Sequence, residues 1–126
     1  MARAGVDQRP DAQAGLSSEQ IVEVRVTAPD AAVAQAIASG LVERRLAACA
    51  QVLGPITSTY WWEGAVETAQ EHLVLAKTTA DRFEGIREHV RSEHPYDNPE
   101  ILAVPVTAAA GTYAAWLREV LAARDD

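Results

Sequence analysis

Cysteine is almost absent from the sequence, because Cys49 is the only one in 126 residues. A single cysteine excludes a disulfide within the chain and any zinc site of the CxxC type. The chain also has no run of about 18 consecutive apolar residues, the length that suggests a membrane-spanning helix, although 48% of its residues are hydrophobic. We therefore expect one cytoplasmic domain with an ordinary core and no membrane partner.

A basic patch is missing as well. The eleven Lys and Arg residues are scattered, and the formal net charge of -7 would repel nucleic acid phosphates. We therefore expect no nucleic acid partner, whereas an acidic surface suits metal cations. The glycine-rich loops of nucleotide-binding proteins and the GxSxG and HExxH motifs of hydrolases are also absent from the sequence. This pattern favours a protein that is not an enzyme.

The first part of the chain differs in composition from the rest. Residues 1–18 are polar, rich in Ala, Gly, Gln and Asp, and show no hydrophobic periodicity. They have no apolar centre of the kind found in signal peptides, and we expect a flexible tail. Residues 19–124 then form a single domain.

Hydrophobic periodicity predicts the first half of this domain. From Ile21, valines alternate with charged residues as in a half-buried strand. A helix is predicted from about 30 to 45, with Asp30 near its N-cap. The sequence "ITSTYWWEGAVETAQEHLVLAKT" predicts two long strands around a tight turn at Glu63 and Gly64.

The second half predicts a helix, a strand and another helix. Residues 79–93 have apolar residues at helical spacing, with Thr79 or Asp81 near the N-cap. "EILAVPV" predicts a strand, and residues 108–124 predict a third amphipathic helix. The order strand–helix–strand–strand–helix–strand–helix predicts an α+β, ferredoxin-like (split βαβ) antiparallel sheet with a long β-hairpin and an extra C-terminal helix. Such a sheet leaves one face bare, and self-association would cover it.

The segment "SEHPYDNPE", residues 92–100, joins the second helix to the last strand. Its two prolines exclude helix and central strand, so we expect a rigid loop. His94, with Glu93 and Glu100, could bind copper or zinc. Alternatively, the His94 ring could cap the carbonyls that end the preceding helix, or act in catalysis with Tyr96.

Three further groups have two interpretations each. Cys49 is the only soft metal ligand, but its small apolar neighbours favour a buried, inert thiol. Aromatic residues at the hairpin tip could line a ligand pocket or anchor a subunit interface. Glu71 and Lys77 share one face of a strand, where they could belong to a cross-strand ion pair or to a polar cleft between subunits.

Several motifs together resemble the CutA family of divalent-cation tolerance proteins. They are "RRLAACAQV", "TSTYWWEG", "EHLVLAKTT", "SEHPYDNPEILAVPV" and "YAAWL", and the resemblance covers about Val22 to Leu121. It implies a ferredoxin-like homotrimer with hairpins exchanged between subunits, and divalent metal, most often copper, bound near His94. Some members carry a further cysteine and a further histidine where this chain has Val26 and Glu93.

The resemblance and the residues together favour a protein that binds copper weakly and acts in the response to metal ions. In this interpretation His94 is the first ligand, assisted by Glu93 or Glu100, and Cys49 is the second candidate. The alternative is a trimeric small-molecule sensor or scaffold module similar to the P-II signalling proteins. Such a protein would bind ligands in clefts between subunits, through Trp62, Glu63, Lys77 and Tyr96.

Overall fold

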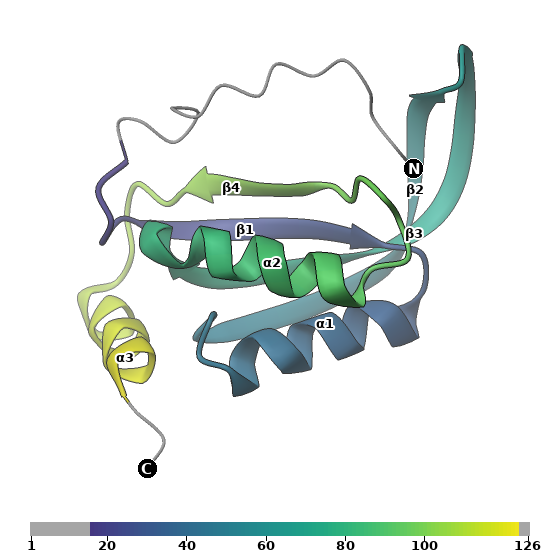
Figure 1. The fold of residues 1–126 in the computed structure, drawn as a ribbon. Helices are drawn as coiled ribbons and strands as arrows, with labels where there is room; N and C mark the ends of the chain where they lie inside the picture. The colour runs from purple at the N-terminus through teal and green to yellow at the C-terminus, as the bar shows by residue number, and fades with distance from the viewer. Residues whose placement is uncertain (1–15, 124–126) are drawn as a thin grey trace.

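A computed structural model describes residues 16–123, and Figure 1 shows its arrangement. In chain order the elements are β1 (Ile21–Ala28), α1 (Ala31–Glu43), β2 (Cys49–Trp62), β3 (Ala65–Thr79), a short 3-10 helix (Ala80–Arg82), α2 (Phe83–Glu93), β4 (Ile101–Pro105) and α3 (Gly111–Ala122). The four strands form one sheet in the order β2-β3-β1-β4, and every pairing is antiparallel. The predicted ferredoxin-like α+β fold with a C-terminal helix is confirmed.

The core lies between the sheet and the pair of helices α1 and α2. Val22, Val24 and Val26 alternate along β1 and are fully buried on the helix-covered face, as the sequence predicts. Ile37 and Leu41 of α1 pack into the same cluster. The hydrophobic effect of this cluster is the main force that holds the helices on the sheet.

The opposite face of the sheet is partly covered by α3. Leu117 and Leu121 of this helix pack on Ile21 and Ala48 at one end of the sheet. Farther along, Leu53 and other apolar side chains of this face are exposed. Within residues 16–123, the bare face that the sequence predicts is therefore covered at one end.

The helices begin in different ways. Asp30 caps α1, because its Oδ1 accepts a hydrogen bond of 2.8 Å from the backbone N–H of Val33. The predicted cap of α2 at Thr79 or Asp81 is wrong. The Thr79 hydroxyl bonds the Asp81 carboxylate instead, Thr79 precedes a 3-10 turn that contains Asp81, and the N-cap of α2 is Arg82, the last residue of that turn.

Strands β2 and β3 form the long hairpin. Glu63 and Gly64 connect them, both with positive φ (48° and 80°), which suits the twist of a two-residue hairpin turn. Strand β1 pairs with β3 only between His72 and Thr79. The rest of the hairpin projects beyond the sheet, as Figure 1 shows.

The described residues at the chain ends bear on two expectations. Residues 1–15 of the predicted tail lie outside the described residues, whereas Leu16 packs against the core. The amide of Asp81 donates to the carbonyl of Ser18, also within the predicted tail. Among residues 16–123, no helix has both the length and the apolar character needed to span a membrane.

Candidate functional site

The loop between α2 and β4 meets the end of β1 and the middle of β3, and we call this region the corner: Thr27, Glu71, His94 and Tyr96. The His94 ring is buried, with 8% of the residue exposed. Its Nε2 lies 2.7 Å from the carbonyl oxygen of Thr27, and its Nδ1 lies 3.2 Å from the backbone nitrogen of Tyr96. Because a carbonyl accepts and a backbone N–H donates, hydrogen on Nε2 satisfies both contacts.

This geometry corrects one interpretation of His94. The residue does end α2, but its backbone N–H makes the capping bond, 2.8 Å long, to the carbonyl of Val90. The ring, which was expected to cap the helix carbonyls, crosses to β1 instead. His94 therefore joins the loop to the sheet.

Tyr96 links this histidine to a buried acid. Its ring packs against the His94 ring with centroids 4.7 Å apart, and its hydroxyl lies 3.5 Å from Oε2 of Glu71. Burial raises the pKa of Tyr96 above its usual 10.0, and the negative charge of Glu71 raises it further.

Glu71 is the unusual group of the corner. Only 2% of the residue is exposed, and the Tyr96 hydroxyl is the one side-chain partner recorded for its carboxylate among residues 16–123. A hydrogen bond of 3.5 Å is at the limit of the useful range, so it compensates little for lost hydration. The corner therefore holds a buried carboxylate that a cation would stabilise.

Lys77 does not supply that cation. Its Nζ lies 2.5 Å from Oε1 of Gln51 and 3.5 Å from Oε2 of Glu23, so the expected cross-strand ion pair forms between Lys77 and β1 and does not involve Glu71. Glu23 also accepts a hydrogen bond from Arg25. This bond, together with the charge of Lys77, holds the pKa of Glu23 below its usual value.

The four predicted metal ligands are not brought together within one chain. Glu93 is exposed at the end of α2, and Glu100 is half-buried just before β4. Cys49 pairs in register with Lys77, whereas the carbonyl that holds His94 belongs to Thr27, farther along the sheet. In the described part of the chain, no three His, Cys, Asp or Glu side chains gather in a way that could hold a metal ion.

Cys49 has a different neighbour. It is half-buried, and its Sγ lies 3.1 Å from the hydroxyl of Tyr113 on α3. This hydrogen bond is the main reason that the pKa of Tyr113 rises to about 12, with burial adding to the effect. The thiol therefore contacts the C-terminal helix at the edge of the sheet, rather than lying wholly inside the core.

Sequence reasoning missed the importance of Glu71. On β3 this acid is in phase with Leu73 and Leu75, and an acid that continues an apolar alternation is the signal that was available. The burial of Glu71 depends on the corner loop, and the alternation of residues along β3 does not predict where that loop lies.

Comparison with known proteins places this chain in a family. Residues 22–120 match the family described as CutA1 divalent ion tolerance protein. The divalent-cation tolerance protein CutA of Thermus thermophilus is 46% identical over 96 residues, covering 76% of this chain and 93% of the relative. That of Citrobacter koseri is 41% identical over 106 residues, covering 84% and 92%.

Solved structures agree with the sequence match. The crystal structure of CutA from Xylella fastidiosa has a TM-score of 0.78 and 35% identity to this chain. The match covers 81% of this chain and 98% of the Xylella chain. Sequence and structure thus lead to one conclusion: this chain belongs to the CutA1 family of divalent ion tolerance proteins.

Proposed function

We propose that the protein is a cytoplasmic, non-catalytic homotrimer that binds divalent metal, copper first, weakly at the corner, and that it takes part in the response to metal ions. Membership of a family named for divalent ion tolerance supports the ligand class. The observation that carries the site is Glu71, a residue with 2% exposure whose carboxylate has one side-chain partner among residues 16–123, at 3.5 Å.

The chemistry of the corner fits a weak rather than a tight site. A divalent cation beside Glu71 offsets its buried charge, and imidazole and carboxylate together suit copper or zinc. Both nitrogens of His94 already have backbone partners, so a metal must displace one of these hydrogen bonds to reach the ring. Because no three such side chains gather within residues 16–123, the remaining ligands would come from water or a neighbouring subunit.

Three features support the trimer. Trp61 at the hairpin tip is 72% exposed, which is unusual for so large an aromatic side chain in a monomer. The hairpin that carries it projects from the sheet (Figure 1). Leu53 and Leu102 are exposed on strands β2 and β4, and copies of the chain would bury them.

Calorimetric titration of copper(II) and zinc(II) into the tag-free protein tests the metal site. We expect saturable binding at one site per chain, and a loss of most of that binding in Glu71→Gln, which removes the charge and keeps the shape. Glu67→Gln is the matched control, because Glu67 is an exposed acid on the same strand.

A second variant, His94→Ala, reports the contribution of the ring, and circular dichroism shows whether it still folds. Equal metal binding by the wild type and Glu71→Gln would contradict the proposed site. Light scattering on the same samples measures the mass of the assembly, and a monomer at all concentrations would contradict the trimer.

A further inference from the structure

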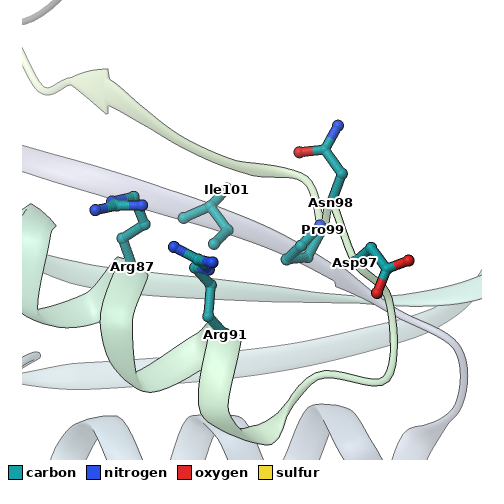
Figure 2. A pocket seen from close by; sticks show the side chains of 6 residues that line it. All are labelled: Arg87, Arg91, Asp97, Asn98, Pro99 and Ile101. Carbon is teal, nitrogen blue, oxygen red and sulfur yellow. The ribbon is translucent and has the colours of Figure 1, made fainter. Parts of the chain in front are cut away.

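A hollow of about 390 Å³ lies outside the corner, between α2 and the start of β4. It is lined by Arg87, Arg91, Asp97, Asn98, Pro99 and Ile101 (Figure 2). Arg87 and Arg91 come from successive turns of α2, and the other residues come from the loop and the first residue of β4. Two cations therefore face one hollow on a chain whose net charge is -7.

The two arginines differ in their partners. The Nε of Arg87 donates a 3.0 Å hydrogen bond to Glu84, one turn earlier on the same helix. Among residues 16–123, no hydrogen bond or ion pair is recorded for the guanidinium group of Arg91. Because residues at i and i+4 are neighbours on a helix, the two positive charges repel each other until an anion lies between them.

The acid in the hollow does not neutralise this pair. Figure 2 shows both arginine side chains extending from the same side of α2, with the guanidinium group of Arg91 next to Ile101, whereas the carboxylate of Asp97 points away from them. Within the described residues, no ion pair joins Asp97 to either arginine. The positive end of the hollow is therefore open to a ligand.

We infer that this hollow binds a small oxyanion with two negative charges, either a phosphate group or a dicarboxylate, between Arg87 and Arg91. Guanidinium groups present paired N–H donors that match the oxygen atoms of both anions. Ile101 and Pro99 add an apolar wall, which favours an anion attached to a small carbon skeleton over a bare ion.

The test uses the full-length assembled protein with two probes, inorganic phosphate and malonate, at constant ionic strength set with sodium chloride. Calorimetry and the shift of the melting temperature report binding. Arg91→Met should weaken binding of the preferred probe about tenfold or more, since a hydrogen-bonded charge is lost. Arg91→Lys keeps the positive charge but loses the paired N–H donors of the guanidinium group. Its affinity for the probe should lie between those of the wild type and Arg91→Met.

Arg25→Met is the matched control, because it removes the same charge from β1 on the sheet face opposite α2. It should bind the probe as the wild type does. Stronger binding of phosphate identifies a phosphorylated ligand, and stronger binding of malonate a dicarboxylate; either supports the inference. No saturable binding of either probe, or equal weakening by Arg91→Met and Arg25→Met, would overturn it.

These variants leave Glu71 and His94 intact. Metal binding at the corner and anion binding in this hollow therefore succeed or fail separately.

Discussion

At the scale of single residues, two buried histidines have opposite surroundings. Both ring nitrogens of His94 have backbone partners, whereas the Nε2 of His89, on α2, has no hydrogen-bond partner among the described residues. The Nε2 of His89 lies against Gly40 of α1. His94 therefore joins segments of the chain, while His89 fills space between two helices.

This packing predicts the effect of a methyl group at Gly40. A Cβ there would overlap Nε2 of His89 and lie 2.9 Å from its Cε1. Gly40→Ala should therefore lower the free energy of unfolding by about 1–3 kcal/mol, less the gain of about 1 kcal/mol that alanine brings to a helix. Urea denaturation measures the change, and His89→Ala in the same chain should remove the penalty. If the losses of unfolding free energy in Gly40→Ala and His89→Ala simply add in the double variant, the new methyl group does not act through the His89 ring.

His89 also predicts a pH dependence of stability. Burial lowers its pKa below the usual 6.5, the charge of Arg44 lowers it further, and Glu93 opposes the shift. Below pH 6.5 the unfolded chain therefore binds this proton more readily than the folded chain, so stability falls as the pH drops toward the lowered pKa.

Thermal denaturation between pH 7.5 and 5 would follow this fall, taking those pH values as roughly the range in which histidine titrates. His89→Gln cannot titrate and should show a smaller fall than the wild type. Identical curves for the two proteins would mean that other groups control stability in this range.

At the scale of elements, the start of α1 depends on one side chain. Asp30 is in extended conformation, and its carboxylate satisfies one of the free N–H groups of the first turn. Asp30→Ala should lower the free energy of unfolding by about 1 kcal/mol, whereas Asp30→Asn should change it by only a few tenths. Chemical denaturation distinguishes the two, and an equal loss in both variants would indicate that the charge of Asp30 matters more than its cap.

Elements with strong periodicity could be predicted from the sequence, and their ends only in part. The alternation of Val22, Val24 and Val26 defines both β1 and its buried face. Asp30 could be identified as a cap from the sequence, because an aspartate just before a helical pattern is commonly the N-cap of that helix. Thr79 and Asp81 mislead, because their side chains bond each other, and a 3-10 turn delays the start of α2.

The candidate site was less predictable than the fold for a physical reason. His94 and Tyr96 stand out because prolines stiffen their loop, but Glu71 is 23 residues earlier than His94 and looks like an ordinary strand acid. It becomes unusual only when the loop covers it. The direction of the His94 ring depends in the same way on the carbonyl of Thr27, which lies on another strand.

At the scale of the whole molecule, the projecting hairpin predicts how the proposed trimer can be weakened. Trp61 is the most exposed of the large hydrophobic side chains at the tip, and aromatic anchors at interfaces often contribute about 2 kcal/mol or more each. Trp61→Ser should therefore shift sedimentation profiles from trimer toward monomer at low concentration. Glu88→Ala, an exposed change on α2, should leave them unaltered. A trimer of unchanged mass at every dilution of Trp61→Ser would exclude the tip as an anchor.

The short reach of β1 has one more consequence. The last residue of β3 that pairs with β1 is His72. Beyond it, β3 pairs with β2 alone, from Glu71 opposite Ile56 to Ala65 opposite Trp62. A two-stranded ribbon is only marginally stable in water, so these amides should open to solvent more often than those of the four-stranded part. In a trimer the neighbouring subunits would close them, and their rate of hydrogen exchange would then depend on how dilute the protein is.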